Sequence, residues 1–148
     1  MNKPIPDSKS PLTWVGMTAS FAKTISESDV YLFAGITGDF GSTHIDEEYM
    51  RESRFGRRIA HGALLVGFMS AASARIHLGP SFVTVGYDRV RFSNPVYFGD
   101  TISVHYEFTH YDVERKRLFA SVTCKNQRDE VVATAINIRA YIGDTYWA

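Results

Sequence analysis

Two short segments of the chain carry the residue types that proton transfer needs. Residues 37–46 read TGDFGSTHID and place a carboxylate, Asp39, five positions before an imidazole, His44. This spacing does not put both groups on one helical face, but a loop can fold both side chains onto one water molecule. Residues 59–62 read IAHG, so Gly62 is expected to present an unpaired N–H at the start of a helix. A carboxylate, an imidazole and an oxyanion donor are the groups that enolate chemistry requires.

Two helices are expected around this loop. Ser26 is a typical N-cap for a helix over residues 27–36, because acidic residues follow it in the first turn. Asp46 is expected to cap a short helix over residues 47–50. The residues between these helices, 38–44, are predicted to form a polar loop.

The apolar stretch that begins at Gly62 is predicted to be the central helix of the fold. Residues 62–79 read GALLVGFMSAASARIHLG and carry no charge before Arg75. Apolar residues surround the expected axis, so a helix over residues 62–77 must be wrapped by other structure. Many of the residues are small, which lets that structure come close. Gly79-Pro80 is expected to end the helix.

The rest of the chain has the alternating pattern of β-strands. Residues 101–110 are the clearest case, with Ile102, Val104, Tyr106 and Phe108 on one face and polar residues on the other. The expected strands are Thr18–Thr24 and residues 82–85, 87–92, 101–110, 118–125 and 131–142. One buried helix followed by a long antiparallel meander predicts an α+β fold in which a curved sheet wraps around a helix.

Composition and charge exclude several classes of protein. The 148 residues are 45% hydrophobic and 22% charged, which is ordinary for a folded domain and rules out wholesale disorder. The chain has 16 lysines and arginines and 16 aspartates and glutamates, so its formal net charge is zero. A net charge of zero argues against a nucleic-acid partner and is compatible with self-association. The single cysteine, Cys124, excludes an intrachain disulfide and a cysteine-based metal cluster.

The length suits one domain, with residues 1–12 as an N-terminal arm and residues 13–148 as the folded unit. The N-terminus lacks the apolar core of a signal peptide. The longest charge-free helical pattern, residues 61–74, is too short to span a bilayer. We therefore expect a cytoplasmic protein without a membrane partner.

Three spaced segments resemble one known family. Residues 38–46 (GDFGSTHID), 54–62 (RFGRRIAHG) and 91–101 (RFSNPVYFGDT) are similar, in this order, to the motifs of the MaoC-like dehydratases. That family includes (R)-specific 2-enoyl-CoA hydratases with a hot-dog fold, an antiparallel sheet wrapped around a long central helix. Gly41-Ser42 stands where the family has Asn-Pro, so the loop lacks the family's asparagine amide.

The resemblance implies a hydratase/dehydratase that acts on 2-enoyl or 3-hydroxyacyl thioesters. It assigns Asp39 as the base and His44 as the group that orients the attacking water and helps return a proton. The N–H of Gly62 would take the enolate-like thioester oxygen, and Ser70 would line the acyl pocket. No metal and no cofactor beyond the coenzyme A of the substrate is implied, and the protein is expected to be a homodimer or a larger homo-oligomer.

Further residues near the motifs are candidates for substrate binding. Phe55 lies in the second motif, and His61 is expected to tie the helix start to the loop. Arg57 and Arg58 are either part of a solvated face or contacts for the phosphates of coenzyme A, which a guanidinium binds well. The carrier is coenzyme A or an acyl-carrier protein.

Three other functions compete with the hydratase. His44 and Asp46 with a distant histidine such as His105 imitate the ligands of a non-haem iron enzyme. The uninterrupted helix between these residues disagrees with the jelly-roll barrels that usually hold such sites. A thioesterase of the same fold and a non-catalytic acyl-thioester-binding subunit remain alternatives, and the intact Asp39/His44 pair argues against both.

Overall fold

The computed structural model describes residues 11–79 and 82–142 of the chain. Residues 1–10 of the expected arm lie outside this part, and a 3-10 helix over Pro11–Trp14 precedes the first strand. The elements that follow are β1 (Thr18–Thr24), α1 (Glu27–Thr37), α2 (Ser42–Ile45), α3 (Glu47–Arg51), α4 (Gly62–Ser73), β2 (Phe82–Phe92), β3 (Thr101–Asp112), β4 (Arg117–Lys125) and β5 (Val131–Tyr141). No helix in the described ranges is long and apolar enough to cross a membrane.

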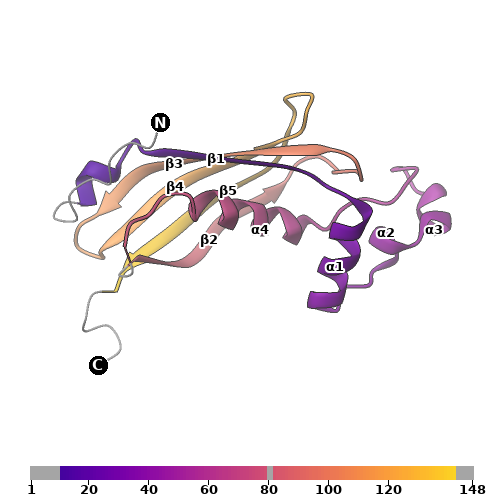
Figure 1. Ribbon diagram of the computed structural model, residues 1–148, viewed down its shortest axis with the longest axis horizontal. Helices are drawn as coiled ribbons and strands as arrows, with labels where there is room; N and C mark the ends of the chain where they lie inside the picture. Colours follow the sequence, from indigo (N-terminus) through magenta and orange to yellow (C-terminus); the bar gives the residue numbers. More distant parts are fainter. Residues whose placement is uncertain (1–10, 80–81, 143–148) are drawn as a thin grey trace.

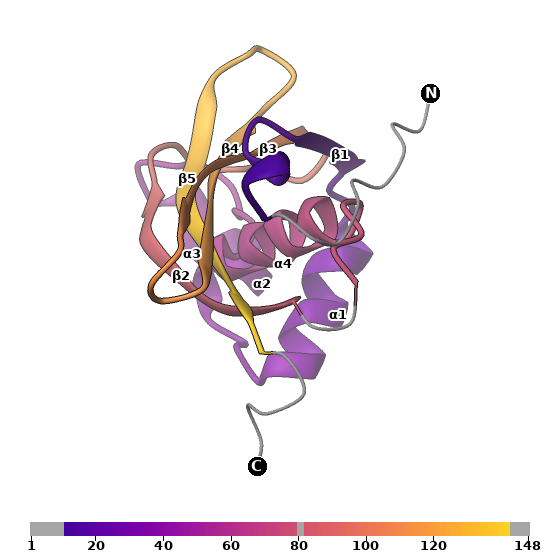
Figure 2. The same cartoon turned by 90° about the vertical axis from the view of Figure 1, so that its left-hand side faces the viewer.

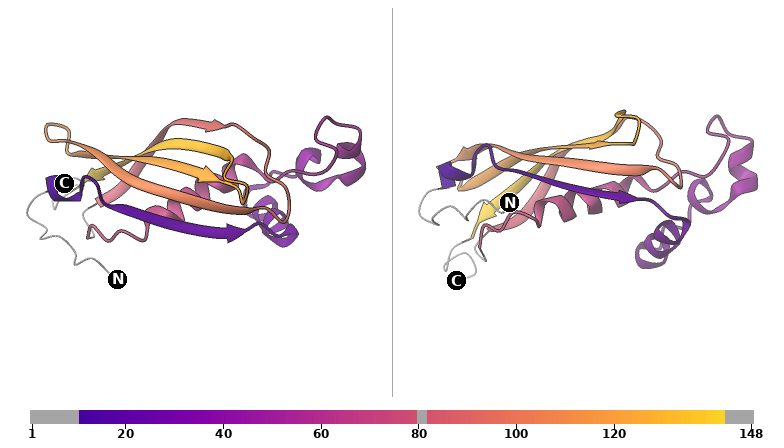
Figure 3. Two further views of the ribbon diagram at one scale, coloured as in Figure 1. Left: turned by 90° about the horizontal axis from the view of Figure 1, so that it is seen from above. Right: turned by 45° about the horizontal axis from the view of Figure 1, so that its top comes forward.

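One curved sheet wraps around α4, which confirms the expected α+β architecture. The five strands pair antiparallel in the order β1-β3-β4-β5-β2. Figure 1 shows α4 running along one face of this sheet, and the end-on view of Figure 2 shows the sheet curving around the helix. Helices α1, α2 and α3 gather beyond one end of the sheet (Figure 3). The start of α4 points toward this group of short helices.

Alternate residues of β3 are apolar and point into the core. Ile102, Val104, Tyr106 and Phe108 are at most 1% exposed. They join Leu65, Phe68 and Met69 of α4 in one hydrophobic cluster. Burying each side chain of this size contributes roughly 1.5–3 kcal/mol, so the packing of α4 on the sheet stabilises the fold.

The strand order differs from a simple meander. Strands β3, β4 and β5 follow one another in the sheet, but β2 pairs with β5 and therefore lies at the edge opposite β1. The two strands expected over residues 82–92 form one strand, with register shifts between Thr84 and Gly86 and between Asp88 and Arg91. Hydrophobic alternation specifies which face of a strand is buried, but it does not specify which strand lies beside it.

Helix α4 is shorter than predicted because its last turn tightens. The N–H groups of Arg75 and Ile76 donate to carbonyls three residues back, those of Ala72 and Ser73. This tighter turn ends the α-helix at Ser73 and carries Ile76 into the core, where it is 5% exposed. The segment 38–44, expected from its sequence to be a loop, is partly helical, because α2 begins at Ser42.

Candidate active site

Asp39 is placed by the end of α1. The chain leaves the helix through Gly38, whose φ of 80° is the left-handed conformation that glycine adopts readily. The N–H of Asp39 then donates to Oγ1 of Thr37 at 3.2 Å. Its carboxylate accepts from the N–H of Gly41, also at 3.2 Å, and is 53% exposed. The chain thus holds the backbone of Asp39 and leaves most of its carboxylate available.

His44 lies on α2 with one ring nitrogen fixed. Its Nδ1 is 2.8 Å from the carbonyl oxygen of Ile59, which can only accept, so Nδ1 carries the hydrogen. Nε2 is therefore the nitrogen that remains free to interact with a water or a substrate. Ile59 is itself held, because its N–H donates to the Thr43 carbonyl at 3.2 Å.

His61 joins the loop to the start of α4, as the sequence predicted. It is 1% exposed, and its Nε2 is 2.9 Å from the backbone carbonyl oxygen of Asp39. Its ring stacks on that of His44 with centroids 3.8 Å apart, and the Phe33 ring packs against it with centroids 4.9 Å apart. The preceding residue, Ala60, donates its N–H to the Val96 carbonyl at 2.8 Å. His61 therefore fixes Asp39 and His44 relative to one another.

Among the residues that the structure describes, one group of three side chains has the donor atoms of a metal site. These are Asp39, His44 and His61, with candidate ligand atoms within 4.8 Å of one another. The set considered from sequence is different. Asp46 accepts from the N–H of Tyr49 as the N-cap of α3, and His105 lies on β3 beside Glu107. The structure therefore does not bring the proposed iron ligands His44, Asp46 and His105 together as one group.

Gly62 begins α4, so its N–H has no acceptor within the helix. It lines a cavity of about 260 Å³ whose walls include Phe55, Leu65 and Phe92. A Cβ built on Gly62 would lie 2.9 Å from two atoms of the Phe92 ring. Asp39 and His44 do not line this cavity, although Ile59, which binds His44, does. Gly62 thus adjoins this cavity, and the preceding residue, His61, contacts Asp39.

Gly41 lies between the two acid–base groups. A Cβ at this position would be 3.2 Å from Oδ1 of Asp39 and 3.7 Å from the ring of His44. In place of the family's asparagine amide, the backbone N–H of Gly41 contacts the carboxylate. A side chain at this position would therefore crowd the carboxylate of Asp39.

The arginines divide into a structural residue and two exposed ones. Arg58 donates to Glu47 and pairs with Glu27, each at 2.8 Å, and its own side chain is only 15% exposed. These contacts hold the pKa of Arg58 above its usual range despite burial. The geometry therefore supports neither alternative for Arg58, a solvated face or a phosphate contact. Arg57 is exposed over the Tyr97 ring at 4.1 Å, and Arg54 is exposed at the Gly62 cavity.

The two remaining predicted residues lie in different surroundings. Phe55 is half-buried and lines the Gly62 cavity. Ser70 is exposed on α4, eight residues after Gly62, beside Tyr87 of β2. Sequence reasoning assigned no role to Phe92, although this residue lies in the third family motif, or to Tyr87. The sequence does not show that these side chains lie near α4, because both belong to the distant edge strand β2.

Comparisons with known proteins agree with this arrangement. The model of the MaoC like domain matches residues 13–132. An (R)-specific enoyl-CoA hydratase of Rhodospirillum rubrum is 41% identical over 109 residues, covering 74% of this chain and 75% of that protein. A 3-hydroxybutyryl-CoA dehydratase of Methylorubrum extorquens is 39% identical over 118 residues, covering 80% and 74%.

A solved structure extends the likeness to three dimensions. The unliganded R-hydratase PhaJ1 from Pseudomonas aeruginosa superposes with a TM-score of 0.76 at 31% identity, covering 86% of this chain and 81% of that one. The fold is the hot-dog fold, and the protein is a hydro-lyase of the hydratase and dehydratase class. The chain belongs to the family of the MaoC-like domain.

Proposed function

We propose that this protein adds water to trans-2-enoyl thioesters, most simply coenzyme A esters, and forms (R)-3-hydroxyacyl thioesters. The observation that carries the proposal is the convergence of Asp39, His44 and His61 within 4.8 Å at the start of α4. His44 keeps Nε2 free, and the carboxylate of Asp39 is largely available. Both groups then accept hydrogen bonds from the two hydrogens of a single water.

The chemistry follows from these acceptors. As the water oxygen bonds to the β-carbon, Asp39 takes one of its protons, and the π electrons move onto the thioester oxygen. The N–H of Gly62 stabilises the negative charge that develops there. The proton held by Asp39 returns to the α-carbon with the help of His44. Both side chains end as they began, and the reverse sequence dehydrates the product.

The direct test uses purified protein with trans-2-butenoyl-CoA. We expect loss of the ultraviolet absorbance of the conjugated double bond and formation of the (R)-3-hydroxy product, identified by chiral chromatography. A chelator present throughout should leave the rate unchanged, because no step needs a metal. Release of free thiol without loss of the double bond would instead identify a thioesterase, and binding without turnover would identify an acyl-binding subunit.

We also propose that the active protein is a homodimer. Large apolar side chains are exposed on α1, on the loop after α1 and on edge strand β2, namely Leu32, Ile36, Phe40, Val85 and Phe92. Ile36 alone is 84% exposed. Exposed apolar side chains together with an unpaired strand edge are typical of an interface. Light scattering at micromolar concentration should give twice the chain mass of 16.6 kDa, and a monomer would contradict the proposal.

A further inference from the structure

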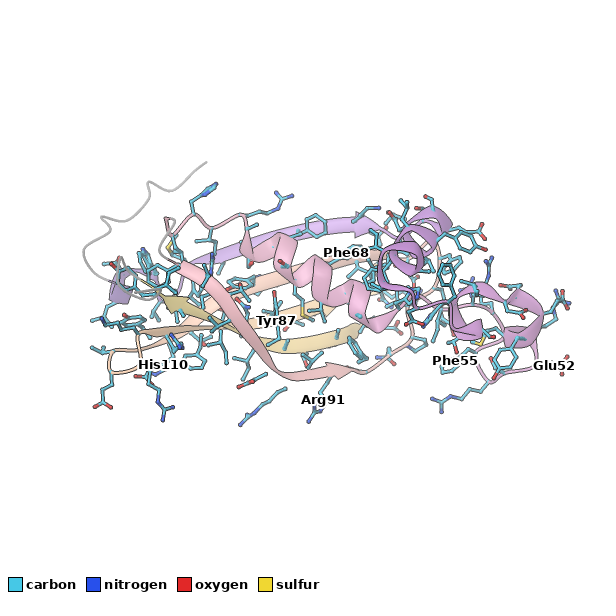
Figure 4. The ribbon with its side chains drawn as sticks, turned by 90° about the horizontal axis from the view of Figure 1, so that it is seen from below. Glu52, Phe55, Phe68, Tyr87, Arg91 and His110 are labelled. Atoms are coloured by element: carbon cyan, nitrogen blue, oxygen red, sulfur yellow. The ribbon has the colours of Figure 1, made fainter. Side chains whose placement is uncertain are left out.

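The inner face of the sheet carries a polar cluster under the second half of α4. Tyr106 of β3 donates to Oδ1 of Asn137 of β5 at 2.7 Å, and both residues are fully buried. Nδ2 of Asn137 donates to the carbonyl of Gly86 on β2 at 3.3 Å. Tyr87 faces Asn137 across the β2–β5 pair, and Arg139 follows two residues later on β5. Figure 4 shows Tyr87 between α4 and the strands.

Two atoms of this cluster are buried without a hydrogen-bond partner. These are Oη of Tyr87 and Nε of Arg139. The Ser70 side chain lies beside Oη of Tyr87, but no hydrogen bond of acceptable geometry joins them. A buried polar group without a partner loses the hydrogen bonds that it makes to water in the unfolded chain, and the loss is larger when the group is charged. Within the described part of the chain, the cluster therefore lacks an acceptor for these two groups.

Arg139 also has no counter-charge among the residues that the structure describes. Its two terminal nitrogens donate to the carbonyls of Ser73 and Phe82 over long distances of 3.5 Å. No carboxylate forms an ion pair with it within residues 11–79 and 82–142. Its positive charge acts on both neighbouring phenols, since it partly offsets the rise that burial causes in the pKa of Tyr87 and of Tyr106. The guanidinium therefore lies close to both tyrosines.

The cluster is aligned with the candidate active site through α4. Ser70, which adjoins Tyr87, follows Gly62 by eight residues, and eight residues of α-helix span about 12 Å. An extended acyl chain of about this length, laid along α4 from Gly62, would end beside Ser70 and the Tyr87 phenol.

We propose that Tyr87 and Arg139 bind a carboxylate at the far end of the acyl chain, so that the preferred substrates are enoyl thioesters of dicarboxylic acids. This inference rests on the proposed hydratase function. A carboxylate supplies what the cluster lacks, because it accepts from both the phenol and Nε–H and neutralises the guanidinium. A methyl-ended chain would leave that charge unpaired.

A variant of Tyr87 distinguishes ligand binding by the cluster from a purely structural role. The contacts of Arg139 with the Ser73 and Phe82 carbonyls help to hold the end of α4, so replacing Arg139 also perturbs the fold. Among the described residues the Tyr87 hydroxyl has only the Ser70 side chain beside it, so Tyr87→Phe perturbs the free protein less than a change at Arg139 does. The melting temperature of this variant should equal or exceed that of the wild type. Only a ligand gives its hydroxyl a role.

The experiment compares two series of trans-2-enoyl-CoA esters of matched length, one ending in a methyl group and one in a carboxylate. We expect kcat/KM at the best length to be about tenfold or more higher for the carboxylate series. Tyr87→Phe should lower that ratio by about tenfold. The control Tyr111→Phe, on β3 outside the cluster, should keep the wild-type ratio.

Binding of the saturated analogues, measured by calorimetry, tests the inference without turnover. Preferential binding of the carboxylate-ended analogue, lost in Tyr87→Phe and retained in Tyr111→Phe, supports the site even where no hydration occurs. Hydration of the methyl series with no preference for a carboxylate overturns the inference and leaves the proposed function standing. Equal binding of the two saturated analogues also overturns it.

Discussion

Replacing Asp39 by asparagine, or His44 by glutamine, should lower kcat for enoyl-thioester hydration by about 10²–10⁴ in each case. Asparagine cannot take the proton from the attacking water, and glutamine cannot provide the free Nε2 that His44 presents. Steady-state rates with trans-2-butenoyl-CoA measure this effect. Circular dichroism and thermal unfolding should change little, because the Asp39 side chain is 53% exposed and carries little packing.

Matched controls for these variants lie nearby on the same chain. Glu48→Gln removes an exposed carboxylate of α3, and His105→Gln removes an exposed imidazole of β3. Neither touches the candidate site, so both should keep wild-type turnover. Near-normal rates in Asp39→Asn or His44→Gln would show that a different residue transfers the proton.

Replacing Gly62 by valine should lower kcat by about 10²–10³ while the far-ultraviolet spectrum remains native, because a side chain there crowds the proposed oxyanion donor. The structure adds a second cause. A Cβ at this position would come within 2.9 Å of the Phe92 ring, which is 52% exposed and free to turn outward. The loss of activity therefore has two competing explanations. The side chain blocks access to the Gly62 N–H, or it displaces the Phe92 ring.

A double variant distinguishes these two causes. Gly62→Ala keeps the N–H and adds only a Cβ, and combining it with Phe92→Ala removes the ring that this Cβ would meet. We expect the double variant to remain as impaired as Gly62→Ala alone, because the Cβ still lies next to the proposed oxyanion site. Recovery of wild-type turnover in the double variant would assign the loss to the displaced Phe92 and remove Gly62 from the catalytic groups.

Local signals in the sequence predicted the elements that depend on neighbouring residues. Ser26 and Asp46 cap α1 and α3 as expected, because a cap needs only a side chain and the N–H groups a few residues later. The alternation of β3 predicted its buried face for a similar reason. The three family motifs identified the class of enzyme, since their residue types and spacing are themselves properties of the sequence.

Only the tertiary structure decided the features that depend on residues far apart in the chain. The place of β2 at the sheet edge brings Phe92 against Gly62 and Tyr87 beside α4. The fold of the short helices gives Arg58 two glutamates and leaves Arg57 exposed, although the two arginines are adjacent in sequence. Strand order and ion pairing depend on which surfaces meet after folding, so a pattern within a short stretch of sequence does not predict them.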